Sequence, residues 1–177
     1  MKNKLKLESF IRNIPDFPKP GILFRDISTL IQNKKAFKEA VDKMAEKYKG
    51  KKIDAVVAVE ARGFILGGAI AHKLGVGFIP VRKKGKLPWK TDSVTYDLEY
   101  GTDTLEIHQD ALNPGDKVLI VDDLLATGGT VKAVTELVEQ KRAKISGIVF
   151  LVELFDLGGK NKLKNYPVHS LIKFPGH

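Results

Sequence analysis

The chain has 177 residues, contains no cysteine, and carries 30 Lys and Arg against 21 Asp and Glu, which gives a formal net charge of +9. The lack of cysteine excludes a disulfide framework and a thiolate metal site. With 43% hydrophobic and 29% charged residues, the composition is that of a folded globular protein, and the length fits one domain over residues 1–177.

The hydropathy pattern predicts a cytoplasmic protein. The N-terminal stretch MKNKLKLESFIRNIP alternates cations with apolar residues and is unlike a signal peptide. No segment approaches the roughly 18 consecutive apolar residues that a membrane-spanning helix needs. The basic excess alone leaves open a nucleic acid, a membrane surface or a small polyanion as the partner, as well as a role in solubility.

Two helices are predicted near the N-terminus. Apolar residues recur at helical spacing over residues 7–14 and predict a short helix that Pro15 ends. A longer helix is predicted over residues 36–49, because apolar residues occupy one face and lysines with acidic residues the other. Gly50 is a typical end for this second helix.

Strand and helix patterns alternate through the rest of the chain. Continuous apolar strands indicate burial on both faces, and parallel neighbours need helical crossovers. We therefore predict an α/β fold, a single-domain, doubly wound, mostly parallel sheet with flanking helices and ligands at the carboxyl ends of the strands. The predicted elements are strand 53–59, helix 63–74, strands 76–81 and 117–121, helix 130–140 and strand 145–154.

The most informative segment is VLIVDDLLATGGT, residues 118–130. A buried strand leads to two adjacent carboxylates, Asp122 and Asp123, and a loop of Gly and Thr residues then opens directly into a helix. The glycines let consecutive N–H groups point inward, the threonines add hydroxyl donors, and the helix N-terminus favours an anion. The segment lacks the Lys of a P-loop, which disfavours a nucleoside triphosphate held in that way. The predicted phosphate loop contains Ala126, Thr127, Gly128, Gly129 and Thr130.

The paired carboxylates suit a sugar beside that phosphate. Asp122 and Asp123 can accept hydrogen bonds from a ribose diol or assist Mg²⁺, which usually takes one or two protein carboxylates and completes its shell with water and substrate oxygens. An isolated Asp-Asp or Gly-Gly pair is more often a plain strand end or turn. The whole series of strand, carboxylates, loop and helix favours a site for a phosphorylated ribose.

This segment resembles the signature of the type I phosphoribosyltransferases, and in its VDDLLATGGT form it resembles their adenine-using branch. The resemblance covers nearly the whole chain. It implies a small N-terminal base-binding hood over residues 1–35 and a mobile catalytic loop over residues 82–104. Four further strings agree in order and spacing: PDFPKPGILFRDI (15–27), VEARGF (59–64), VRKKGKLP (81–88) and YDLEYGTDTLEIHQDAL (96–112).

The resemblance implies roles for individual residues. The carboxylate pair and the phosphate loop would hold the ribose and phosphate of phosphoribosyl pyrophosphate (PRPP). Phe24 and Leu124 would sandwich adenine, and the backbone at Arg25 would read its edge. Glu99 and Arg62 are the implied catalytic residues, with Glu99 accepting or returning a purine proton. Pyrophosphate contacts are implied for Ala61, Arg62, Gly63, Arg82, Lys83 and Lys86, the last three reaching the neighbouring subunit of a homodimer.

The implied reaction transfers 5-phosphoribose from PRPP to N9 of adenine, giving AMP and pyrophosphate in purine salvage. Mg²⁺ is the implied cofactor, held through the substrate with help from Asp122 and Asp123. On this interpretation, Arg62 and the cations of the loop at residues 82–90 face pyrophosphate. The charge then indicates a small polyanionic substrate, with no nucleic-acid or membrane partner.

Three other functions stay open. The nearest alternative is a phosphoribosyltransferase for another base, such as hypoxanthine, guanine or orotate, which parallel assays would separate. A regulator that binds PRPP without turnover would be expected to lack the basic loop and Glu99. A nucleic-acid module would need a recognition helix, an aromatic RNA-binding pattern or a basic stripe, none of which the sequence contains.

Two further patterns concern structure more than chemistry. The four histidines, at positions 72, 108, 169 and 177, lack metal-like spacing and are expected to pack or to lie at the surface. The glycine that the family usually places after the helix at 130–140 is missing from Lys141-Arg142-Ala143. This departure puts the end of the helix in doubt and leaves the site unaffected.

Overall fold

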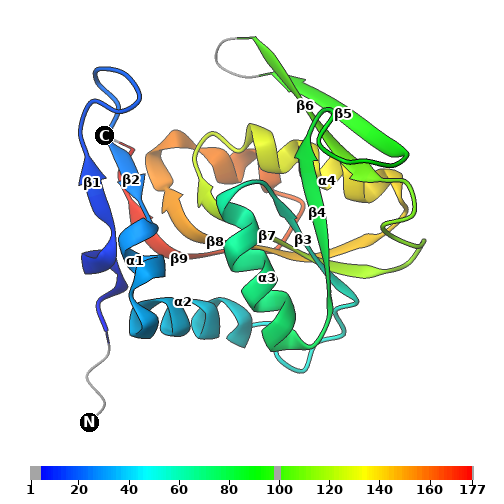
Figure 1. Cartoon of the computed structure of the whole chain (residues 1–177), viewed down its shortest axis with the longest axis horizontal. Helices are drawn as coiled ribbons and strands as arrows, with labels where there is room; N and C mark the ends of the chain where they lie inside the picture. Colours follow the sequence, from blue (N-terminus) through cyan, green and yellow to red (C-terminus); the bar gives the residue numbers. More distant parts are fainter. Residues whose placement is uncertain (1–4, 98–100, 177) are drawn as a thin grey trace.

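The computed structural model describes residues 5–97 and 101–176, and at its centre is a seven-stranded sheet (Figure 1). The strand order is β5-β6-β4-β3-β7-β8-β9. β4, β3, β7, β8 and β9 run parallel, whereas β5 and β6 form an antiparallel hairpin that joins the sheet where β6 pairs with β4. The strands are β3 (Ala55–Val59), β4 (Gly77–Lys83), β5 (Thr91–Asp97), β6 (Thr102–His108), β7 (Lys117–Leu125), β8 (Lys144–Leu154) and β9 (Val168–Phe174).

The central parallel strands β3, β7 and β8 are buried on both faces, because successive side chains enter two different cores. On β3, Val56 packs in a cluster with α2 and α3, while Val57 faces the opposite cluster with α4. Helices thus cover both sides of the sheet (Figure 1), which confirms the predicted doubly wound α/β fold. No helix in the described part of the chain is long and apolar enough to cross a membrane. The helices are α1 (Ser28–Gln32), α2 (Lys34–Glu46), α3 (Arg62–Leu74) and α4 (Gly129–Gln140).

The N-terminal segment differs from the sequence prediction. A 3₁₀ helix, η1 (Leu7–Phe10), replaces the first half of the predicted helix, and a strand, β1 (Arg12–Ile14), follows it. β1 pairs antiparallel with β2 (Phe24–Asp26) in a separate two-stranded sheet. The prediction of a single helix was wrong because the apolar spacing serves burial of Leu7 and Ile11 in the core, while β2 supplies a backbone partner for the residues that follow.

The other predicted elements are present with shifted ends. β7 extends past the predicted strand and includes Asp122 and Asp123. α4 ends without a glycine because Arg142 itself takes the left-handed conformation, with φ of 57°. Neither β9 nor the two 3₁₀ helices that precede it, η2 (Phe155–Leu157) and η3 (Gly159–Leu163), were predicted from the sequence.

The segment at residues 82–104 is largely a hairpin in its described part. Gly85 and Pro88 break regular structure only between β4 and β5, and the strands β5 and β6 then resume it. At the base of the hairpin, the Lys141 ammonium pairs with Asp92 and donates to the carbonyl of Gln109 at 2.9 Å. The end of α4 therefore fixes the hairpin to the domain, and the mobility of its tip stays a prediction.

Candidate active site

Three parallel strands bring the predicted site residues to one edge of the sheet. β3 pairs in register with β4 on one side and with β7 on the other. Parallel neighbours end at the same edge, so the loops that follow them meet there. The structure thus brings together residues 60–63 after β3, residues 82–83 at the end of β4, and residues 122–130 at the end of β7.

The loop between β7 and α4, residues 126–128, borders a cavity of about 200 Å³. Gly128 is the N-cap of α4 and has φ of 79°, a conformation that strains any residue with a side chain. The first N–H groups of a helix have no intrahelical partners and carry partial positive charge, so the cavity suits an anion such as phosphate. Its walls are Arg62, Asp122, Asp123, Leu124, Leu125, Ala126, Thr127, Gly128, Gly129, Thr130 and Val131.

Asp122 and Asp123 form a buried acidic pair, 9% and 7% exposed. Asp122 Oδ1 accepts a hydrogen bond of 2.8 Å from the backbone N–H of Asp123. Burial, followed by the negative charge of Asp123, raises the pKa of Asp122 well above the usual value of 3.8. Gly63 makes this packing possible, because a Cβ there would lie 2.8 Å from Asp122 Oδ1. An ionised pair in this position is costly until a ligand donates to it.

Arg62 connects the acidic pair to the predicted base site. The chain leaves β3 through a cis peptide bond between Glu60 and Ala61, and α3 then begins at Arg62. Arg62 Nε lies 2.8 Å from Asp123 Oδ2, and its guanidinium carbon lies 5.1 Å from the centroid of the Phe24 ring. Apart from this ion pair, Asp123 Oδ2 is buried without a hydrogen-bond partner, so it can accept from a ligand.

The two predicted adenine-sandwich residues come from different sheets. Phe24 lies on β2, half-buried, with the Phe17 ring edge-on at a centroid distance of 5.1 Å. Leu124 lies near the end of β7 and lines the phosphate cavity. Because Arg62 lines this cavity and contacts the Phe24 ring, the predicted adenine site lies next to the phosphate cavity.

The Arg25 side chain has a structural position that the sequence did not indicate. It is buried, 5% exposed, although Arg25 was predicted to act through its backbone. Its guanidinium donates to Asn13 Oδ1 at 2.6 Å and to the carbonyl of Pro175 at 2.9 Å, and lies 4.6 Å from the centroid of the Phe174 ring. Arg25 therefore ties β2 to β1 and to the C-terminal segment.

The predicted basic residues at the end of β4 lie against carboxylates. Arg82 Nη2 donates to Glu60 Oε2 at 3.0 Å, and the backbone N–H of Lys83 donates to Glu60 Oε1 at 2.7 Å. Lys83 Nζ lies 3.0 Å from Asp103 Oδ2. The hydrogen bond from Arg82 lowers the pKa of Glu60, while pairing raises the pKa of Lys83 and lowers that of Asp103. Lys86 is exposed in the turn that follows.

Sequence reasoning missed three side chains at this edge. Glu60 and Asp103 hold the basic residues described above, and the signal was present, since both acids stand in strings that flank the run of cations. Tyr96, on β5, places its hydroxyl 3.4 Å from Thr130 Oγ1, next to the phosphate loop. Glu99, the predicted proton-transfer residue, lies outside the described residues.

A preformed metal cage is not part of the described structure: within residues 5–97 and 101–176, no group of three or more His, Cys, Asp or Glu side chains could hold an ion. The pair of Asp122 and Asp123 still fits Mg²⁺, which binds through one or two carboxylates together with substrate oxygens. Within the described residues, Asp123 Oδ2 pairs with Arg62 and accepts no hydrogen bond, which leaves it able to support a metal as well.

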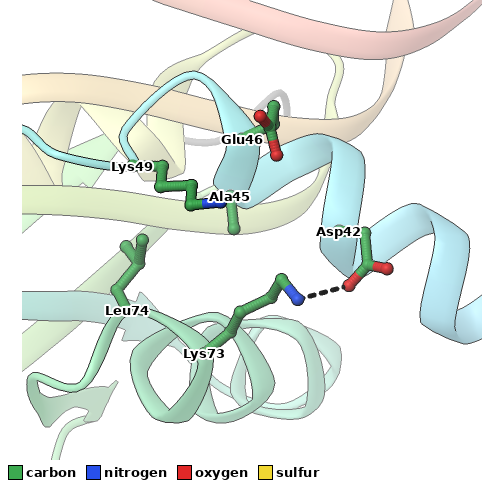
Figure 2. Close-up of a pocket in the computed structure, with 6 residues that line it drawn as sticks. All are labelled: Asp42, Ala45, Glu46, Lys49, Lys73 and Leu74. Atoms are coloured by element: carbon green, nitrogen blue, oxygen red, sulfur yellow. Dashed lines mark ion pairs between the residues drawn. The ribbon is translucent and has the colours of Figure 1, made fainter.

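A different hollow, of about 210 Å³, lies between α2 and α3 (Figure 2). Lys73 of α3 reaches across to Asp42 of α2, with 2.7 Å between Nζ and Oδ1, and Lys38 contacts the same carboxylate at 2.5 Å. Because α3 begins at the edge that carries Asp122, its last turn and Lys73 lie toward the opposite edge. The Asp42–Lys73 ion pair thus connects the two helices across this hollow, which is separate from the site.

The geometry agrees with a comparison against known families. Residues 28–175 match the model of the phosphoribosyl transferase domain. The chain therefore belongs to the phosphoribosyltransferase family. Its relatives within that family include the adenine phosphoribosyltransferase of Brachyspira hyodysenteriae, 57% identical over 170 residues, which covers 96% of this chain and 100% of that protein.

Solved structures give the same assignment. The adenine phosphoribosyltransferase of Thermoanaerobacter pseudethanolicus superposes with a TM-score of 0.93 at 52% identity, covering 96% of this chain and 98% of that one. The enzyme from Saccharomyces cerevisiae, complexed with an imino-altritol bisphosphate and adenine, superposes with a TM-score of 0.89 at 43% identity, covering 94% and 96%. Both the fold and the family predicted from sequence are confirmed.

Proposed function

We propose that the chain is an adenine phosphoribosyltransferase, which transfers 5-phosphoribose from PRPP to N9 of adenine and releases AMP and pyrophosphate in purine salvage. One observation carries the proposal. The buried pair of Asp122 and Asp123 lies beside the N-terminus of α4, and Arg62 joins this pair to Phe24. The similarity to adenine phosphoribosyltransferases over almost the whole chain supports adenine as the base.

The phosphorylated ribose would bind at the end of β7. The 5′-phosphate would accept from the N–H groups of residues 126–130 and from the hydroxyls of Thr127 and Thr130. The ribose hydroxyls would donate to Asp122 and Asp123, which stabilises carboxylates whose ionised form is costly while they are unliganded. The cavity beside these residues supports this placement.

Pyrophosphate would lie toward the ends of β3 and β4, between Ala61, Arg62 and Gly63 on one side and the basic residues Arg82, Lys83 and Lys86 on the other. We propose that the latter three act across a homodimer interface. Arg82 and Lys83 pair with Glu60 and Asp103 in this structure. Binding of pyrophosphate would therefore exchange carboxylate partners for phosphate oxygens at similar geometry.

Adenine would stack between Phe24 and Leu124, with its edge read by the backbone at Arg25 and covered by a hood over residues 1–35. Glu99 would receive the proton from N9 as that nitrogen becomes the nucleophile. As the bond from C1 of ribose to pyrophosphate lengthens, C1 becomes cation-like, and closure of residues 82–104 would exclude water from it. Positioning of the two substrates then supplies much of the rate.

Mg²⁺ is the proposed cofactor, and when bound it neutralises negative charge on the pyrophosphate group. Asp122 and Asp123 are the carboxylates that would support it, since they are adjacent, buried and at the same edge as Arg62. The cytoplasmic location expected from the sequence stays a prediction.

The test is formation of AMP from adenine and PRPP, with Mg²⁺ and with a chelator in its place. We expect AMP and pyrophosphate in equal amounts, only with the metal present. Hypoxanthine, guanine and orotate, assayed in parallel, should give much slower turnover. Faster turnover of another base would reassign the substrate, and PRPP binding without any product would indicate a regulator in place of an enzyme.

A further inference from the structure

The segment that follows β8 approaches the phosphate loop closely at a pair of glycines, Gly128 and Gly159. Leu125, at the end of β7, pairs with Glu153 of β8, so the chains leaving these two strands run side by side. A Cβ on Gly159 would overlap the carbonyl oxygen of Ala126 and lie 2.8 Å from Leu125 Cδ1. A Cβ on Gly128 would in turn lie 2.7 Å from the carbonyl oxygen of Gly159. Only glycine at both positions permits this approach.

The same segment is anchored on two further sides. We call residues 158–166 the brace. Lys160 Nζ lies 2.8 Å from Oε2 of Glu153, whose side chain is 6% exposed. The Tyr166 hydroxyl donates to Glu139 Oε1 of α4 at 2.6 Å, and Leu163 is 1% exposed in the core beneath α4. The brace is thus fixed to β8 and to α4, the helix that the phosphate loop opens.

This arrangement matters because the loop would hold its ligand through backbone N–H groups, whose direction depends on the path of residues 126–128. A site of this kind needs its donors held within roughly 0.5 Å of the productive position. Gly128 reaches its positive φ without steric cost, so its own conformation does not restrict the loop to one path. The contact with Gly159 restricts the path of residues 126–128.

We propose that Gly159 is a positioning residue for PRPP: it seats the brace against the phosphate loop and thereby fixes the donors for the 5′-phosphate. This inference rests on the proposed function and deepens it. Gly159 does not line the phosphate cavity and lies against the loop residues Ala126 and Gly128, which do. Substitution of Gly159 should therefore weaken binding of the phosphorylated substrate and leave binding of adenine unchanged.

The experiment compares Gly159→Ala with the wild-type protein. We expect the KM for PRPP to rise by roughly tenfold or more, because a displacement near 1 Å in a positioned site has effects of this size. The KM for adenine should stay within twofold. Gly77→Ala is the matched control: it makes the same change at the start of β4, where a Cβ meets no atom within 4 Å, and should leave both constants unchanged.

A second pair of variants covers the case in which Gly159→Ala does not fold. Lys160→Met removes the ion pair with Glu153 and should raise the KM for PRPP about threefold, while Lys160→Arg keeps the charge and should restore it. Calorimetric titration with ribose 5-phosphate measures binding at the phosphate loop without turnover. If the wild-type protein binds this probe but makes no AMP, the proposed function is wrong. The affinities of the variants for the probe then decide whether Gly159 positions the loop. If the KM values for PRPP and adenine change equally, or neither changes, the inference that Gly159 positions the phosphate loop is wrong.

Discussion

The phosphate side and the base side of the site are built in different ways. On the phosphate side, the acidic pair and the loop come from one stretch, residues 122–130, between a central strand and a core helix. On the base side, Phe24 and Arg25 belong to a small sheet outside the central one. Arg25 is held there by a residue 12 positions earlier, Asn13, and by one 150 positions later, Pro175.

Because the two sides are built differently, the binding of PRPP and the binding of adenine should be sensitive to different kinds of substitution. The phosphate side depends on backbone that two core elements and the brace hold in place, so it tolerates little change of volume. The base side depends on hydrogen bonds from the Arg25 side chain to residues distant in the sequence, so it should respond to changes of chemistry more than of size. Variants of the two sides should therefore separate in their effects on PRPP and on adenine.

The largest expected effect comes from replacing both carboxylates, Asp122→Asn with Asp123→Asn. Two hydrogen bonds to charged acceptors contribute about 3–6 kcal/mol together, so kcat/KM should fall by roughly 10²- to 10⁴-fold. Steady-state kinetics of AMP formation give the value, and far-ultraviolet circular dichroism confirms that the fold survives. Activity close to wild type would contradict the assignment of these residues to the ribose.

The phosphate side could be predicted from the sequence because its signal is local. Strand, carboxylates, loop and helix follow one another within residues 118–130, and each has a propensity that can be read from neighbouring residues. The brace gave no such signal. The contact between Gly128 and Gly159 joins positions far apart in the chain, and glycine alone does not reveal what approaches it.

The base side could be predicted only in part. The PDFPKPGILFRDI string pointed to Phe24 and Arg25, yet the preceding residues were predicted as a helix and form η1 and β1 instead. β1 exists because β2 pairs with it, and a helical spacing of apolar residues cannot report such a partner. The buried side chain of Arg25 depends on Pro175 and Phe174, which no local pattern connects to it.

Arg25→Lys tests whether the base side affects adenine binding separately from PRPP binding. Lysine cannot serve Asn13 and Pro175 at once with the planar geometry of a guanidinium, so β2 should shift and carry Phe24 with it. We expect the KM for adenine to rise about 5- to 10-fold, which corresponds to roughly one lost hydrogen bond, with the KM for PRPP nearly constant. Arg12→Lys is the control, because its side chain is 56% exposed and lies 3.7 Å from Asp26.

Gly159→Ala is expected to do the opposite, raising the KM for PRPP and leaving the KM for adenine nearly constant. If Arg25→Lys and Gly159→Ala raised the same KM, the two sides would not be independent, and the comparison would fail. A combined variant should add the two effects in free energy, because the altered sites share no partner.

Asp122→Asn alone should separate stability from activity on the phosphate side. The pKa of Asp122 is raised in the folded state, so the folded protein binds this proton more tightly than the unfolded chain does. The stability that this proton contributes is therefore present below pH 3.8 and is lost as the pH rises toward the folded pKa. The neutral amide should raise the midpoint of thermal unfolding at pH 7 by about 2–4 °C, the shift expected for roughly 1 kcal/mol, while turnover falls.

The check is calorimetry of the unliganded protein at pH 4 and pH 7. The stabilisation by Asp122→Asn should be larger at pH 7 than at pH 4, because the raised pKa of Asp122 costs the folded wild-type protein more stability the further the pH lies above 3.8. Asp110→Asn makes the same change at an exposed position and should shift neither midpoint. A lower midpoint for Asp122→Asn at pH 7 would mean that the pair stabilises the empty site.

The smallest expected effect concerns the ion pair that anchors the brace. Burial alone would raise the pKa of Glu153, but Lys160, Ser170 and the charge of Lys173 outweigh it and lower the pKa below 4.5. Glu153 thus contributes stability that is present above pH 4.5 and is lost as the pH falls through its folded pKa. Glu153→Gln should cost about 1 kcal/mol at pH 7, a modest value because Lys160 is 39% exposed and can turn to water.

Urea unfolding of Glu153→Gln between pH 7 and pH 3.5 measures this contribution directly. The gap between wild type and variant should close as the pH falls, since protonation removes the same charge that the substitution removes. Glu136→Gln, which breaks the more exposed pair with Lys132 on α4, should show a smaller gap at pH 7. A gap that stays constant with pH would mean that Glu153 holds the brace through packing, and the phosphate side would then depend on shape alone.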